Sequence, residues 1–289
     1  MYRNHACVYN VKFKVSSNGA LQTRHYKSNK YKDLHVYDDD EKCQKRGRIA
    51  VDNLDDRATI RQDSLSRSRN LVIDYACENE FIWKSFITLT FKNNVTDVSL
   101  ANKTFANWRR QMTRFCKQNG FEFSYLCVPE FQKRGAVHYH MLTNLEVNSL
   151  YLPLQENKKN MYDVKFWRQG WSSAFDIIHD TDDKFNVALY ITKYLYKDLD
   201  NRLLGYTRVL KSNNLKKHNE FYLLTNSDTY KRAMNFIKEK GYDLTNFYVF
   251  EPSEENSYIT PYTALDYKSS NRLNNSILKD ILQNEGLEF

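Results

Sequence analysis

The order of sequence patterns between residues 80 and 200 constrains the fold of this chain most strongly. The run from Phe81 to Phe91 is dense in aromatic and β-branched residues, which predicts a buried strand. Apolar residues then recur at helical spacing, which predicts an amphipathic helix that Ser99 caps and Asn119-Gly120 ends. The pattern thus begins with a strand and a helix that could cover it.

A hairpin comes next in the same region. Residues 121–131 and 136–143 are predicted strands, and residues 132–135 lie near their turn. A further strand is predicted at 174–178 and a helix at 182–199. Because hairpin strands packed by helices are typical of one fold class, the sequence predicts an α+β domain with a central antiparallel sheet and flanking helices.

The rest of the chain divides around this pattern. Residues 1–63 are polar and irregular apart from an apolar alternation over 8–15, and we expect an N-terminal segment that could join the sheet. Residues 64–215 form the predicted central domain. Residues 216–289 are expected to form accessory helices and a tail, with an amphipathic helix over 230–240.

Charge and cysteine content narrow the class of partner. The formal net charge of +8 favours a polyanion, either nucleic acid or an anionic membrane. No apolar run approaches a membrane span and the N-terminus has no signal-peptide core, so we expect nucleic acid and no membrane. The five cysteines are widely spaced without a C-x-x-C pair, which indicates a reducing cytoplasm rather than a disulfide framework or cysteine zinc site.

Two histidines in the second hairpin strand are candidate metal ligands. Side chains alternate along a strand, so His138 and His140 share one face while Val137 and Tyr139 face the core. Imidazoles at i and i+2 offer two ligands from a rigid backbone. The alternative is a pair of hydrogen-bonded surface histidines.

A third ligand depends on the hairpin register. A four-residue loop at 132–135 would pair Glu130 with Val137 and turn its carboxylate away from the histidines. A five-residue loop at 131–135, or a bulge near Gly135, would bring it to their face. Two imidazoles and a carboxylate could hold Mn²⁺ or another divalent ion, whereas imidazole ligation weakens Mg²⁺ binding. Otherwise Glu130 is a solvated carboxylate.

A tyrosine-lysine stripe is the second candidate site. At about 100° per residue, Tyr190, Lys193, Tyr194 and Lys197 gather on one side of the predicted helix, and Tyr196 lies about 160° from Tyr194. Neighbouring cations favour the phenolate, the form in which tyrosine is a nucleophile, and also neutralise charge on a phosphoryl group. In a chain with 21 tyrosines, the alternative is a stripe of surface aromatics.

Three blocks, taken together and in order, resemble the motifs of the HUH endonucleases, the rolling-circle replication initiators of small single-stranded DNA phages and plasmids. The blocks are residues 86–91, residues 130–140 and residues 190–197. The paired tyrosines resemble the two-tyrosine subgroup, which includes microvirus and filamentous-phage initiators. The resemblance covers roughly residues 64–215 and implies a ferredoxin/RRM-like HUH endonuclease fold for them.

The resemblance implies a nicking and rejoining reaction. One tyrosine attacks a DNA phosphodiester, leaving a 5′-phosphotyrosine and a free 3′-OH, and the second tyrosine allows the transfer that releases a circular strand. The residues it assigns are Tyr190 and Tyr194 as nucleophiles, Lys193 and Lys197 as assisting cations, and His138, His140 and Glu130 as ligands of Mg²⁺ or Mn²⁺.

Four further cations are predicted to bind DNA because they lie on or near the motif elements: Arg109, Arg114, Lys133 and Arg134. The expected substrate is a single-stranded origin in the cytoplasm of a bacterial host. Because no Walker A string occurs, we expect a host helicase as well as a host DNA polymerase to act with the protein.

Two other functions fit parts of the same pattern. A relaxase or single-strand transposase would use the same chemistry, although relaxases often carry long accessory domains and transposases usually carry one tyrosine. A non-catalytic single-stranded nucleic-acid binder would use exposed aromatics and basic residues. That alternative does not explain why His138, His140, Tyr190 and Tyr194 should converge.

Overall fold

The structure is a computed structural model, and it describes residues 5–16, 20–34, 67–147, 152, 162–177, 191, 206–239, 241–250 and 262–269. The chain forms two compact units. Arg61–Lys217 make up the first, here called the central unit, and Met1–Ile60 with His218–Phe289 make up the second, the terminal unit.

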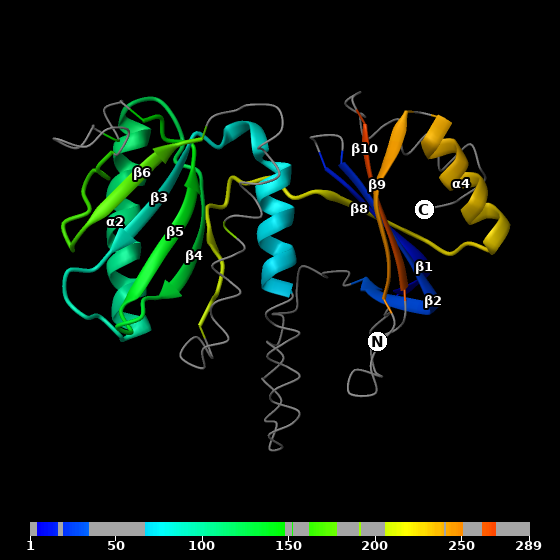
Figure 1. Ribbon diagram of the computed structural model, residues 1–289, viewed down its shortest axis with the longest axis horizontal. Helices are drawn as coiled ribbons and strands as arrows, with labels where there is room; N and C mark the ends of the chain where they lie inside the picture. Colours follow the sequence, from blue (N-terminus) through cyan, green and yellow to red (C-terminus); the bar gives the residue numbers. More distant parts are fainter. Residues whose placement is uncertain are drawn as a thin grey trace, which may run out of the picture. The chain divides into compact units, whose positions relative to one another are not determined.

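The central unit is built on a five-stranded antiparallel sheet (Figure 1). Its strand order is β6-β3-β5-β4-β7, and every pair is antiparallel. The strands are β3 (Ser85–Thr90), β4 (Tyr125–Phe131), β5 (Val137–Thr143), β6 (Ser172–Asp176) and β7 (Leu210–Lys211). With the helices that cover it, this sheet confirms the predicted α+β class.

Helix α2 (Val98–Gln118) covers one face of this sheet and crosses behind it in Figure 1. Asp97 caps the helix by accepting from the backbone N–H groups of Ser99 and Leu100, so the predicted cap at Ser99 was wrong by two residues. Gly120, with φ of 85°, follows the helix as predicted. The buried side of α2 packs on alternate strand residues: Phe105, Trp108 and Met112 meet Ile87, Leu89, Tyr139 and Met141 in one core cluster.

A second, smaller core lies on the opposite face of the sheet. It contains Phe86, Leu126, Val128 and Leu142, which alternate along their strands with residues of the α2 core. A helix over residues 67–78 contributes the cover: Val72, Tyr75 and Ala76 belong to this cluster. Trp83, which follows the short 3-10 helix η1 (Glu80–Ile82), fastens the helix by donating to the carbonyl of Ala76 at 2.9 Å.

The terminal unit is a second antiparallel sheet with strand order β8-β1-β2-β10-β9. Its elements are β1 (His5–Val15), β2 (Ala20–Leu34), β8 (Asn219–Leu223), α4 (Ser227–Glu239), β9 (Tyr242–Phe250) and β10 (Tyr262–Ser269). Where the sequence pattern favoured accessory helices and a tail, residues beyond 216 thus also supply three strands. The early strands pair with these late ones and with no strand of the described central sheet, because β1 matches β8 and β2 matches β10. Helix α4 confirms the predicted amphipathic helix.

A polar cluster joins β1 to β8 in the terminal unit. The carboxylate of Glu220 accepts from the ammonium of Lys12 at 2.6 Å and lies 2.9 Å from Nε2 of His218, and the Tyr222 hydroxyl also donates to it. Burial by itself would raise the pKa of Glu220, but these hydrogen bonds and the Lys12 charge outweigh it and hold that pKa well below its usual range. The charged carboxylate is therefore the form that stabilises the native unit.

Among the described residues, no helix is long and apolar enough to cross a membrane.

Candidate metal centre

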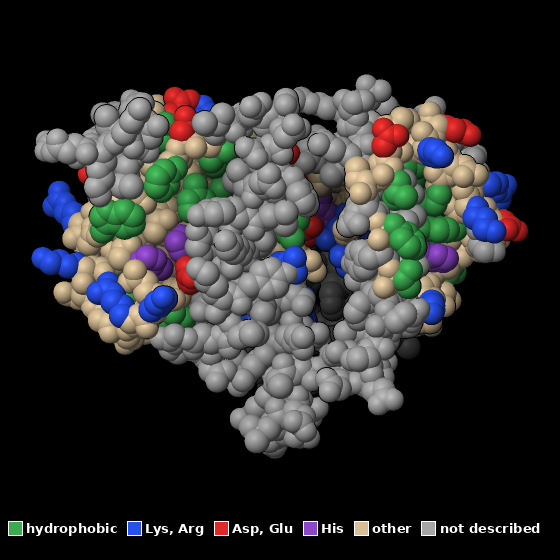
Figure 2. Space-filling view, viewed as in Figure 1, with side chains coloured by type: hydrophobic (Ala, Val, Ile, Leu, Met, Phe, Trp, Pro, Cys, Tyr) green, Lys and Arg blue, Asp and Glu red, His purple; other side chains and the backbone are tan. Residues whose placement is uncertain are grey.

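Glu130, His138 and His140 converge on one face of the central sheet. Their ligand atoms all lie within 4.8 Å of one another, and Nε2 of His140 lies 2.8 Å from Oε2 of Glu130. Both groups are buried, whereas His138 is partly exposed. Figure 2 shows histidine side chains reaching the surface where Figure 1 draws β5, so a ligand can approach from solvent. The three residues form a group that could hold a metal ion.

The turn between β4 and β5 brings the glutamate to the histidines. Gly135 adopts a φ of 88°, its N–H donates to the carbonyl of Gln132, and the N–H of Gln132 donates to Ala136. This is a three-residue loop closed by a glycine bulge, and it pairs Phe131 with Val137. Glu130 is therefore directly opposite His138, on its side of the sheet. The bulge that the sequence left as one of its alternatives is the arrangement found.

Two threonines of β3 hold the imidazoles from the other side. Thr88 is paired with His140 and Thr90 with His138 across the β3–β5 ladder. Their hydroxyl oxygens lie 3.1 Å from Nδ1 of His140 and 2.7 Å from Nε2 of His138. The sequence patterns had assigned these residues no role in the site. The signal was present in the alternation of the strand, which puts both threonines on the face away from Ile87 and Leu89.

The contacts of His140 leave its Nε2 available for exchange between a proton and a metal. Without a metal, Nε2–H donates to Glu130 and Nδ1 accepts from the hydroxyl of Thr88. A threonine hydroxyl can also accept, so it can take a proton from Nδ1–H once Nε2 gives its lone pair to a cation. The same three side chains therefore satisfy His140 in both states. The Phe86 ring stacks on the imidazole with centroids 6.0 Å apart and limits its rotation.

The protonation state of His138 also suits a ligand. Burial, followed by repulsion from His140, lowers the pKa of His138 to about 4, although Glu130 acts in the opposite direction. The imidazole is consequently neutral near pH 7, which is the form that binds metals.

The two predicted DNA-binding residues of the turn differ in their surroundings. Arg134 donates to the carbonyl oxygens of Phe91 and Lys92 and to Oε1 of Gln132, which fastens the turn to the segment after β3. Lys133 is exposed at the tip of the turn.

Arg109 and Arg114 are not brought to the metal centre. Both lie on α2, which covers the opposite face of the sheet from the three candidate ligands. Arg109 donates to the hydroxyl of Tyr125 at 3.2 Å, at the start of β4, whereas Glu130 stands near its end. Any contact they make with DNA is thus separate from the metal centre.

The predicted nucleophiles and their cations lie outside the described residues: Tyr190, Lys193, Tyr194 and Lys197. One neighbour in the chain is described. Ile191 is helical and fully buried, and it belongs to the core cluster of Phe86, Val128 and Leu142. Those three residues share the sheet face of the candidate ligands, so the chain at Ile191 packs on that same face.

Residues 84–199 match a family of replication-associated proteins, the one named for the replication-associated protein ORF2. The chain is similar to replication-associated proteins. The matched stretch is less than half of the chain, and it contains β3 to β6, helix α2, the metal centre and the tyrosine-lysine segment. No curated protein and no solved structure matched the chain. The similarity supports a role in DNA replication as an initiator.

Proposed function

We propose that this protein initiates rolling-circle replication by nicking one DNA strand at an origin and later rejoining it. The observation that carries the proposal is the convergence of Glu130, His138 and His140 within the segment that matches replication-associated proteins. A relaxase or transposase would share the chemistry, but the family match favours replication.

The reaction we propose is a transesterification at phosphorus. The phenolate oxygen of Tyr190 or Tyr194 forms a bond to the phosphorus as the bond to the 3′ oxygen breaks. The 3′ oxygen takes up a proton and becomes the 3′-OH primer, and the 5′ end stays on the tyrosine as a phosphodiester. After synthesis, the other tyrosine repeats the attack on the regenerated origin, and the released 3′-OH displaces the first tyrosine to close the circle.

The metal centre supplies the electrostatic part of this proposal. A divalent ion held by the two imidazoles and the carboxylate would polarise the scissile phosphate as a Lewis acid. We favour Mn²⁺ over Mg²⁺, because imidazole ligands suit the softer ion. Thr88 and Thr90 hold the imidazole rings in place, and Lys193 and Lys197 neutralise charge on the phosphoryl oxygens.

The position of Ile191 supports the assignment of the nucleophiles. Consecutive Cα atoms are about 3.8 Å apart, so Tyr190 cannot lie far from a residue packed on the metal-centre face. In the helix that the sequence predicts, Tyr194 is the i+3 neighbour of Ile191, about 5–6 Å away between Cβ atoms.

The proposed substrate is a single-stranded origin in a bacterial cytoplasm, with unwinding and synthesis supplied by a host helicase and a host DNA polymerase. Lys133 and Lys197 would contact the phosphates beside the scissile bond, and Arg134 would add its charge while it fixes the turn.

The test is the covalent protein–DNA adduct. Purified protein is incubated with Mn²⁺ and single-stranded DNA from the element that encodes it, and the adduct is resolved by denaturing electrophoresis. We expect an adduct from the wild type and from Tyr196→Phe, a matched control that lies off the stripe, and none from Tyr190→Phe/Tyr194→Phe. DNA binding without an adduct in all three proteins would replace this proposal with a non-catalytic binding role.

A further inference from the structure

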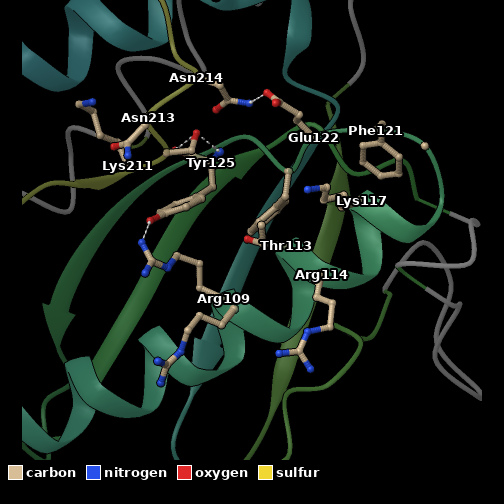
Figure 3. Close-up of a pocket in the computed structure, with 14 residues that line it drawn as sticks. Arg109, Thr113, Arg114, Lys117, Phe121, Glu122, Tyr125, Lys211, Asn213 and Asn214 are labelled. Carbon is tan, nitrogen blue, oxygen red and sulfur yellow. Dashed lines mark hydrogen bonds between the residues drawn. The ribbon is translucent and has the colours of Figure 1, made fainter.

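An open, basic groove lies on the α2 side of the central unit, away from the metal centre. It has a volume of about 870 Å³ and is formed by α2, the start of β4 and the segment after β7. Its charged lining residues are Arg109, Arg110, Arg114, Lys117, Lys211 and Glu122. Figure 3 shows these side chains, with those of α2 on one wall and Lys211 on the other.

The charges of the basic groove are almost all positive. Five cations face one carboxylate, and the amide of Asn214 donates to that carboxylate at 3.1 Å. Within the described part of the chain, no carboxylate pairs with any of the five. Arg109 donates to Tyr125, Arg110 to Asn107, and the ammonium of Lys211 lies 4.6 Å from the ring centre of Tyr75. The groove is therefore suited to an anionic ligand.

The spacing on α2 suits a ligand with several phosphates. Arg110, Arg114 and Lys117 follow one another at i, i+4 and i+7 and so share one side of the helix. Seven residues of helix span about 10 Å. Three successive phosphates on one DNA strand cover a similar length, at roughly 3.4 Å of axial rise per step. A row of cations on a rigid helix can thus match a row of backbone phosphates.

The groove cannot serve the same phosphate as the metal centre. Tyr125 lines the groove and Glu130 lies five residues further along β4, which is about 17 Å at the rise of a strand. The two sites also lie on opposite faces of the sheet. A DNA segment in the groove is therefore a different part of the molecule from the one that would be cut.

Base stacking is not what the groove offers. The rings of Phe123 and Tyr125 at its base are buried, with exposed fractions of 4% and 3%, and Phe121 is only partly exposed. Proteins that hold unpaired strands usually add accessible aromatic rings to a basic track. Without them, contacts fall on the backbone, and a duplex presents its phosphates in fixed rows.

We propose that the basic groove binds the sugar-phosphate backbone of a duplex DNA segment, such as a hairpin stem beside the origin, and so positions the single strand for the metal centre. The site is sequence-independent, because phosphate contacts fix register and carry no base information. The proposal rests on the proposed function only in that DNA is the substrate.

The experiment measures binding without cleavage. Full-length protein in EDTA is titrated by fluorescence anisotropy with a hairpin that carries a single-stranded tail, and with an unstructured single strand of equal length, over a series of salt concentrations. The groove variant is Arg110→Ala/Arg114→Ala/Lys117→Ala. The matched control, Arg168→Ala/Lys216→Ala/Lys217→Ala, removes the same charge from exposed side chains that do not line the groove.

We expect the groove variant to flatten the salt dependence of hairpin binding. Each phosphate contact contributes about 0.9 to the slope of log K against log salt, so losing two or three contacts lowers the slope by roughly 2–3. The control should change it by less than about 1, and both variants should keep the wild-type circular dichroism spectrum. The unstructured strand should respond less than the hairpin.

Three results would overturn the proposal. Equal slopes in the groove and control variants would mean that only overall charge matters. An equal loss for the hairpin and the single strand would remove the duplex. Displacement of the hairpin by millimolar inorganic phosphate would make the groove a small-anion site. The adduct assay keeps the two proposals apart: an adduct with unchanged hairpin binding in the groove variant refutes only the groove, and groove-dependent binding without any adduct refutes only the nicking reaction.

Discussion

The Thr88→Val substitution tests whether the β3 threonines position the metal ligands. Valine keeps the shape of threonine and replaces its hydroxyl with a methyl group. The contact removed is the one of 3.1 Å between the Thr88 hydroxyl and Nδ1 of His140, and both side chains are buried. No water can replace the hydroxyl easily there, so Nδ1–H of the metal-bound imidazole would have no acceptor.

The size of the effect follows from two independent considerations. A buried donor left without a partner costs about 1–3 kcal/mol. Loss of the outer hydrogen bond of a metal-bound histidine lowers metal affinity about 10–100-fold, which corresponds to roughly 1.4–2.7 kcal/mol. The two ranges agree. Because Phe86 still confines the imidazole ring, we expect weakened binding of Mn²⁺ within this range rather than complete loss.

Isothermal titration calorimetry with Mn²⁺ at pH 7 measures the change directly. Thr88→Ser keeps the hydroxyl and should bind within a few-fold of the wild type, and His140→Ala should abolish binding at this site. A folded Thr88→Val protein with wild-type affinity would refute the argument that the hydroxyl orients His140. Equal weakening by serine and valine would point to packing of the threonine methyl group instead.

Two further substitutions test the folds of the two units. Gly170→Ala should destabilise the central unit by about 1–3 kcal/mol in urea unfolding, because its Cβ would stand 2.3 Å from the nitrogen of Lys92 and 2.4 Å from the oxygen of Thr90, both backbone atoms; wild-type stability would show that the strand end yields freely. Glu220→Gln should destabilise the terminal unit by about 1–3 kcal/mol at pH 7. Since the native pKa of Glu220 is depressed, this stabilisation is fully present above the unfolded pKa of about 4.3 and is lost as the pH falls further, so the gap between wild type and variant in hydrogen exchange of β1 should close in acid; a gap that is independent of pH would contradict the charge assignment.

The metal centre illustrates how far a local pattern reaches. Alternation along one strand was enough to place His138 and His140 on a single face and Tyr139 in the core, as found. It could not place Glu130, because the register across the hairpin depends on the conformation of Gly135. Thr88 was missed for a related reason: nothing local links it to His140, 52 residues away.

Sequence alone determined the secondary structure that periodicity encodes, namely the buried strand before α2, the helix itself, the hairpin and α4, together with the chemical identity of the candidate ligands. Only the tertiary structure decided which distant segments meet. It paired β2 with β10 across more than two hundred residues, gathered Arg110 and Lys211 around one groove, and separated Arg109 and Arg114 from the metal centre. The physical reason is that periodicity reports which side of an element is buried, whereas the partner that buries it is chosen by non-local packing and strand pairing.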